Sequence, residues 1–142
     1  MPDIRKVNEE YAVIGRNLIE NEEVLEYIKD SEATIIYLSS EQAKTQNGKI
    51  IFAQCEKVAE KYKWGIPCDF TITVFEPNCE DLTPDQLRIL IFHELLHIGI
   101  DFNSSGQEVF KINPHDLEDF KYIIDRFGTD WISGSEGEEF TL

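Results

Sequence analysis

Thr83-Pro-Asp-Gln-Leu-Arg-Ile-Leu-Ile-Phe-His-Glu-Leu-Leu-His-Ile-Gly-Ile-Asp101 carries the strongest structural signal in this chain. Three of its residues mark the start of a helix: Thr83 is suited to cap it, Pro84 stands at the first helical position, and Gln86 follows the cap by three residues. Apolar residues dominate from Leu87 to Ile100, which predicts a helix that is buried nearly all round. We expect the rest of the chain to pack around this helix.

The same segment contains His93-Glu94-Leu95-Leu96-His97, an H-E-x-x-H motif. Residues four apart lie on one face of a helix, so His93 and His97 project together. Two imidazoles at this spacing can bind one zinc ion, with Glu94 beside it as general base. The alternative is a chance match, which about one chain in several hundred of this length would carry. Burial favours the metal, because unpartnered polar groups in a core cost roughly 1–3 kcal/mol each.

A third metal ligand is needed, because a catalytic zinc has three protein ligands and one open position. The chain has only three histidines, and the third is His115. Asn113 and Pro114 before it predict the N-cap and first residue of a second helix, which ends at Gly128. A loop can then place His115 over the motif helix, and we expect it to be the third ligand. A surface histidine is the alternative interpretation.

Other residues could complete the site. Asp116 is either an alternative metal ligand or a carboxylate that fixes an imidazole tautomer, and Asp101 could fill the second role. Tyr122 is a candidate donor to the oxyanion, although a core or surface tyrosine is the simpler interpretation. In the chemistry that these residues suggest, zinc lowers the pKa of its bound water. Glu94 takes the proton as water attacks a carbonyl and delivers it to the leaving amine.

Hydrophobic patterns predict the remaining elements. Residues 4–29 carry two offset apolar stripes with helical spacing, which indicate one bent helix or two short ones. Trp131 and Ile132 are expected to pack back on the domain. Runs of β-branched and aromatic residues, with one Asn-Gly turn, predict strands at 33–38, from residue 49 onward, at 68–75 and at 108–112.

Length and composition bound the class of protein. The 142 residues suffice for one domain, expected over 1–133, with an acidic flexible tail at 134–142. No apolar run reaches the roughly 18 residues of a membrane span, and the N-terminus has no apolar signal region. We therefore expect a cytoplasmic protein with no membrane partner. The three widely spaced cysteines predict reduced structural thiols, with Cys79 the most exposed.

The net charge of −15 argues against nucleic acid as a partner, because a phosphate backbone is bound by lysine and arginine. An acidic surface suits solubility and basic substrates. A small, strongly acidic protein can also imitate DNA, and this interpretation stays open as a minor one.

The segments 93–99, 114–120 and 127–131 together are similar to the putative phage metallopeptidase domain family, and the resemblance extends over roughly 33–131. It implies an α+β, minimal zincin-like fold with an N-terminal helix, a small three- to four-stranded mixed sheet and two active-site helices. It also implies that His93, His97 and His115 bind Zn²⁺ and that Glu94 is catalytic. A distant similarity links the chain to SprT-like metallopeptidases. The metzincin pattern fits less well, because Ile100 and Asn103 stand where it requires glycine and histidine.

These patterns predict a zinc-dependent metallopeptidase that acts on a peptide or protein substrate. In zincins a sheet edge next to the site binds substrate in extended form, and the strand predicted at 68–75 is the candidate for that edge. The alternative is a zinc-stabilised, catalytically silent acidic interaction protein, such as a phage–host decoy or a DNA mimic. The glutamate of the motif favours the enzyme, because metal binding alone does not require it.

Overall fold

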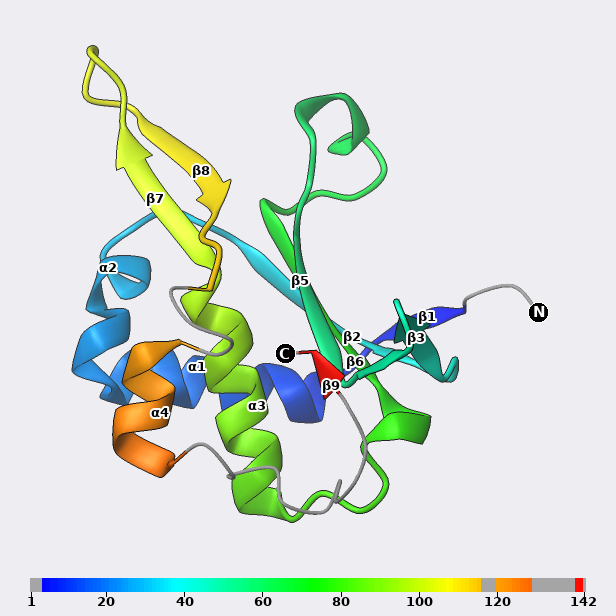
Figure 1. Cartoon of the computed structure of the whole chain (residues 1–142). Helices are drawn as coiled ribbons and strands as arrows, with labels where there is room; N and C mark the ends of the chain where they lie inside the picture. The colour runs from blue at the N-terminus through cyan, green and yellow to red at the C-terminus, as the bar shows by residue number, and fades with distance from the viewer. Residues whose placement is uncertain (1–3, 116–119, 129–139, 142) are drawn as a thin grey trace.

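The protein has an α+β fold, as predicted, in a computed structural model that describes residues 4–115, 120–128 and 140–141 (Figure 1). Short 3₁₀ helices occur at Glu23–Leu25, Glu60–Tyr62 and Glu76–Asn78. The other elements are, in chain order, β1 (Arg5–Val7), α1 (Glu9–Asn21), α2 (Glu26–Lys29), β2 (Ile35–Ser40), β3 (Lys44–Gln46), β4 (Lys49–Ile51), β5 (Ala53–Lys57), β6 (Phe70–Phe75), α3 (Pro84–Leu96), β7 (Ile98–Phe102), β8 (Glu108–Ile112), α4 (Lys121–Phe127) and β9 (Phe140–Thr141).

The main sheet has the strand order β1-β2-β6-β5, in which β2 and β6 are parallel and the other pairs antiparallel. This agrees with the small mixed sheet that was expected. All six residues of β6 are buried, and β6 is paired on both sides. The prediction that 68–75 forms the sheet edge is therefore wrong, and β5 is the edge strand on that side. Two smaller sheets have the orders β3-β4-β9 and β7-β8.

The N-terminal segment divides differently from its prediction. The first residues of the expected helix form β1, which pairs with β2 from Arg5↔Ser40 to Val7↔Leu38. The helix starts only at Glu9, because the Asn8 side chain accepts a hydrogen bond from the backbone of Tyr11 and so caps it. The second apolar stripe forms the separate helix α2, so the alternative of two short helices is the correct one.

Helix α3 begins as predicted and ends earlier. Thr83 and Gln86 form a capping box in which each side chain accepts a hydrogen bond from the other's backbone N–H. The helix is buried all round from Leu90 to Leu96. The predicted continuation to Ile100 is wrong, because Ile98–Phe102 forms β7 and pairs with β8. A run of apolar residues fits a buried strand as well as a buried helix, and only the pairing with β8 distinguishes them.

The second predicted helix also starts later than expected. Residues 113–115 have no regular secondary structure, and α4 covers Lys121–Phe127. Gly128 follows α4 with a φ of 87°, which confirms the predicted helix end. The predictions for Asp116, for Trp131 and Ile132, and for most of the tail lie outside the described residues. Within the tail, Phe140–Thr141 pairs in parallel with β4.

The core lies between the main sheet and the helices α1 and α3 (Figure 1). Buried side chains from each of these elements form it. Its largest fully buried side chains include Leu18 of α1, Phe70 and Ile72 of β6, and Leu90 and Leu95 of α3. Because α3 is packed on several sides, its backbone is held firmly. The side chains that it presents to the site are therefore well positioned.

The cysteines are free thiols in the structure, which agrees with the structural role predicted for them. Cys79 was expected to be the most exposed of the three, but Cys79 and Cys55 are both half-buried. Its thiol donates a hydrogen bond to the carbonyl of Phe52 at 3.3 Å. Burial raises the pKa of Cys79 to about 12, so the group stays protonated and unreactive at neutral pH.

Gly15 provides a test of the packing between α1 and the sheet. A Cβ at this position would lie 2.2 Å from the Tyr37 hydroxyl oxygen and 2.3 Å from the ring carbon that bears it. We expect Gly15→Ala to lower the free energy of unfolding by about 1–3 kcal/mol, because Tyr37 is buried and must move. Denaturant unfolding measures this change. Gly65→Ala is the matched control, since nothing lies within 4 Å of its added Cβ; an equal loss in both variants would contradict the packing described.

Candidate metal centre

The three histidines of the chain converge at the C-terminal end of α3. His93 and His97 project from one face of that helix, as the H-E-x-x-H spacing predicted, and His115 reaches them from the loop after β8. One ring nitrogen of each residue lies within 4.8 Å of the others, and the Nε2 atoms of His93 and His115 are 2.8 Å apart. Residues that are 22 positions apart thus form one compact cluster of nitrogen donors.

The orientation of His97 is set by the backbone of the loop that carries His115. Its Nδ1 lies 2.7 Å from the carbonyl oxygen of Asn113. A carbonyl oxygen can only accept, so Nδ1 carries the proton and Nε2 keeps a lone pair. This is the tautomer in which a histidine offers Nε2 to a metal ion, and a carbonyl partner of this kind is common around metal sites.

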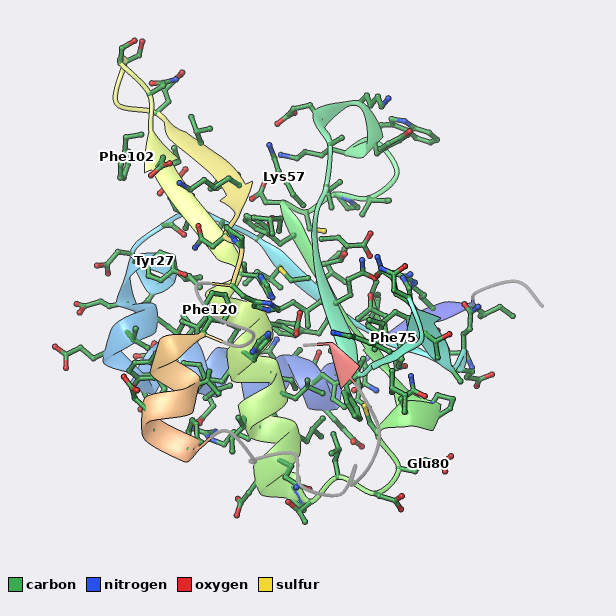
Figure 2. The ribbon with its side chains drawn as sticks, in the orientation of Figure 1. Tyr27, Lys57, Phe75, Glu80, Phe102 and Phe120 are labelled. Carbon is green, nitrogen blue, oxygen red and sulfur yellow. The ribbon has the colours of Figure 1, made fainter. Side chains whose placement is uncertain are left out.

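Phe120, which is labelled in Figure 2, packs its apolar ring against the three histidines. Its ring centroid lies 5.1 Å from that of His93, 4.9 Å from that of His97 and 5.2 Å from that of His115. The residue itself is buried. An apolar neighbour lowers the local dielectric constant and restricts the rings that it contacts.

Glu94 lies beside the cluster, inside the protein. It is only 1% exposed, and its Oε2 lies 3.9 Å from Nε2 of His93. Burial raises the pKa of the Cys55 thiol, on the edge strand β5, well above its usual range. The nearby Glu94 carboxylate adds to this effect, which places Cys55 close to Glu94. The Glu94 carboxyl group thus lies near both the Cys55 thiol and the imidazole of His93.

The donor set fits a metal ion. Zinc binds imidazole nitrogen at about 2.0–2.1 Å, so two nitrogens of a tetrahedral site lie roughly 3.3–3.4 Å apart. The distances within the cluster bracket this value, and small side-chain shifts suffice to match it. His93 is fully buried, while His97 and His115 are partly exposed, so the cluster is reachable from one side. A metal would also bring the buried imidazoles together without requiring any of them to be charged.

Other predicted site residues lie elsewhere. Asp101, proposed as a carboxylate behind an imidazole, forms an exposed ion pair with Lys111 at 2.7 Å. The Tyr122 ring packs on Phe92 and its hydroxyl accepts a hydrogen bond from Arg126 at 3.0 Å, which supports the surface interpretation over the oxyanion role. Asp116 lies outside the described residues.

Two contributors to the site were not predicted. These are Phe120 and Asn113, of which Asn113 was expected only as the cap of the second helix. Their proximity to His93 and His97 depends on contacts between segments more than 15 residues apart, which no local pattern reports. The one available signal was the position of Asn113, two residues before the third histidine.

Comparison with known proteins identifies a family. The family described as putative phage metallopeptidase matches residues 5–136, which include the three histidines of the cluster, Glu94 and nearly all described elements. No curated protein and no solved structure matches the chain. In the described part of the chain, no helix has both the length and the apolar character of a membrane span.

Proposed function

The chain belongs to the putative phage metallopeptidase family, and we propose that it is a zinc-dependent metallopeptidase that hydrolyses peptide bonds with Glu94 as general base. The observation that carries this proposal is the convergence of His93, His97 and His115 beside the buried Glu94 carboxylate. This arrangement of three imidazoles, with Glu94 next to His93, is suited to hydrolysis because it supplies both a metal site and a base.

Zinc is the proposed ion because three neutral imidazole nitrogens suit it, whereas magnesium and calcium prefer oxygen ligands. His93, His97 and His115 would hold it, each through Nε2. When bound, zinc polarises the scissile carbonyl and lowers the pKa of a coordinated water toward neutrality.

Glu94 moves the proton. Its carboxylate accepts a proton from the attacking water and delivers it to the amine nitrogen of the departing peptide. Burial at 1% exposure keeps bulk water from competing for the carboxylate, and the apolar ring of Phe120 strengthens electrostatic interactions at the cluster. Because the Asn113 carbonyl holds the Nδ1 proton of His97, that ring keeps its ligand nitrogen in place during the reaction.

The proposed place for the peptide is the outer edge of β5. Among the described residues, this strand pairs only with β6 in the main sheet, and it contacts α3, which carries the motif. An extended peptide can add to such an edge through backbone hydrogen bonds, which need no particular side chains. Binding there would place a peptide bond close to Glu94, since Cys55 of β5 lies near that carboxylate.

A second substrate contact is proposed at residues 58–67, the arm between β5 and β6. The arm and the β7–β8 hairpin extend to the same side of the molecule, beyond the C-terminal end of α3 (Figure 1). Trp64 is 89% exposed and Tyr62 52%, with Ile66 also exposed. Exposed aromatic groups that cluster in this way mark binding surfaces. They favour substrates with large apolar side chains.

Trp64→Ala is expected to raise KM about tenfold for an apolar peptide and to leave kcat nearly unchanged. The reason is that Trp64 would contribute binding energy equally in the ground and transition states, about 1.4 kcal/mol. Steady-state kinetics on one cleaved peptide measure both constants. Trp64→Phe is the matched control and should keep most of the affinity. An unchanged KM in Trp64→Ala would remove the arm from the substrate site.

The proposed function is tested by digesting an unbiased peptide library and identifying the products by mass spectrometry. Cleavage by the zinc-loaded protein should stop on chelation and return when one equivalent of zinc is added. If zinc binds stoichiometrically and no peptide is cleaved, the peptidase proposal fails. The catalytically silent interaction protein would then be the better description.

A further inference from the structure

Asn113 is connected to the end of α3 by an unusual number of hydrogen bonds. Its backbone N–H donates to the His97 carbonyl at 2.6 Å, and its carbonyl accepts from His97 Nδ1 at 2.7 Å. Its side-chain amide donates to the carbonyl of Ile98 at 3.1 Å and, more weakly, to that of Leu96 at 3.4 Å. One residue thus contacts three consecutive residues, of which the middle one is in the histidine cluster.

These bonds link the end of α3, where His97 lies, to the loop that carries His115. Leu96 and Ile98 are the sequence neighbours of His97, where α3 ends and β7 begins. Asn113 itself lies two residues before His115. The last carbonyls of a helix lack intrahelical partners, so the Asn113 amide supplies donors where the chain needs them. Fixing Asn113 therefore fixes the start of the loop that carries His115.

Gly99 makes the close approach of Asn113 possible. A Cβ at position 99 would lie 2.5 Å from the side-chain oxygen of Asn113 and 2.6 Å from Cγ of Lys111. Lys111 is flexible and can move, but the Asn113 amide is held by its two acceptors. Tyr27 of α2 supports the same place, since its hydroxyl donates to the Ile98 carbonyl at 2.6 Å. The packing around Asn113 is thus built for its side chain.

We propose that Asn113 is the positioning residue of the metal centre. Its side chain clamps the loop to the end of α3, and this clamp both fixes the tautomer of His97 and holds His115 within reach of His93. The inference rests on the proposed function only in that the three histidines bind a metal ion. A purely structural role, in which Asn113 does no more than stabilise the β7–β8 hairpin, is the alternative.

The experiment compares Asn113→Ala with Asn103→Ala in the full chain. Asn103 lies at the other end of the same hairpin, where its side-chain oxygen accepts from the backbone of Ser105 and Gln107. We expect Asn113→Ala to weaken zinc binding about 10- to 100-fold, measured by competition with a chelating dye, because partners of metal ligands contribute that much. Asn103→Ala should bind zinc like the wild type. Equal weakening in both variants would leave only the structural role.

A second readout reports on His97 directly. Long-range ¹H–¹⁵N spectra of the metal-free protein should show the His97 ring protonated at Nδ1 in the wild type. Asn113→Ala keeps the backbone carbonyl but removes the side chain that anchors it, so we expect a weaker preference of His97 for the Nδ1-protonated tautomer, together with an altered visible spectrum of the cobalt-substituted protein. An unchanged His97 ring in Asn113→Ala would overturn the proposal. These measurements need no peptidase activity. A protein whose zinc binding depends on Asn113 but which cleaves no peptide would contradict the proposed function and leave this inference standing.

Gly99→Ala keeps the test decisive if Asn113→Ala does not fold. The added Cβ would displace the Asn113 side chain without removing any of its atoms, so zinc binding should again weaken, by a smaller factor. Where Asn113→Ala does fold, a double-mutant cycle should give a combined loss smaller than the sum of the two, since both substitutions act through one side chain. Wild-type zinc affinity in Gly99→Ala, with His97 still protonated at Nδ1, would contradict the clamp.

Discussion

His115→Ala is expected to lose stoichiometric zinc binding at neutral pH. The variant leaves only His93 and His97, and two imidazoles from one helix hold a zinc ion far less tightly than three. Changes to partners of a metal ligand already cost 10- to 100-fold in affinity, so loss of a ligand should cost at least about 100-fold. The effect should be large because Nε2 of His115 lies 2.8 Å from Nε2 of His93, and because His115 is the one member of the cluster, within the described residues, that comes from neither α3 nor its C-cap.

Metal analysis after dialysis, followed by competition with a chelating dye, measures this loss. Asp101→Asn is the matched control, because it changes a carboxylate on the adjacent hairpin that is bound to Lys111. That control should keep its zinc. Replacing Asp116 should do less than replacing His115. Full zinc occupancy in His115→Ala would show that His115 is not a ligand, and a further loss only in His115→Ala/Asp116→Ala would assign the position to the aspartate.

Glu94→Gln is expected to lower kcat by a factor of about 100 to 10,000 while zinc stays bound. Glutamine has nearly the same shape as glutamate, but it cannot accept and return the proton, and general acid–base catalysis contributes in this range. The carboxylate is not among the three nitrogen donors of the cluster, so metal affinity should change little. This separation of turnover from metal binding distinguishes a catalytic glutamate from a structural one.

Single-turnover kinetics on a peptide found in the library digest measure the effect, with zinc content determined on the same samples. Glu10→Gln is the control, an exposed glutamate on α1 that should behave as wild type. Thermal unfolding verifies that the buried substitution leaves the protein folded. Equal rates for wild type and Glu94→Gln would contradict the assignment of the general base.

Local signals predicted the part of the site that is local. The capping box of Thr83 and Gln86 and the spacing of His93 and His97 both act within a few residues, and both are as predicted. The predicted end of α3 was wrong, because Ile98 and Ile100 fit a buried strand as well as a helix. Their conformation follows from pairing with β8, a contact that the apolar pattern does not encode.

His115 illustrates a correct placement for an incorrect reason. Its position beside His93 was predicted, but from the first turn of a helix capped by Asn113. In the structure the Asn113 side chain donates to Leu96 and Ile98 instead, so residues 113–115 form a loop. Asparagine caps helices and bridges loops with the same amide, and the available tertiary acceptors decide between the two. The prediction that 68–75 forms the sheet edge was wrong for a related reason, since strand order in a sheet depends on pairings between distant segments.

The most direct test is an anomalous diffraction experiment at the zinc absorption edge on crystals of the zinc-loaded protein. We predict a single peak about 2.0–2.1 Å from Nε2 of His93, His97 and His115, with a fourth position occupied by water and open toward Glu94. No peak at the three histidines would contradict the metal centre. A peak whose fourth position is closed by a protein side chain would contradict the catalytic role, because a structural zinc has no place for substrate.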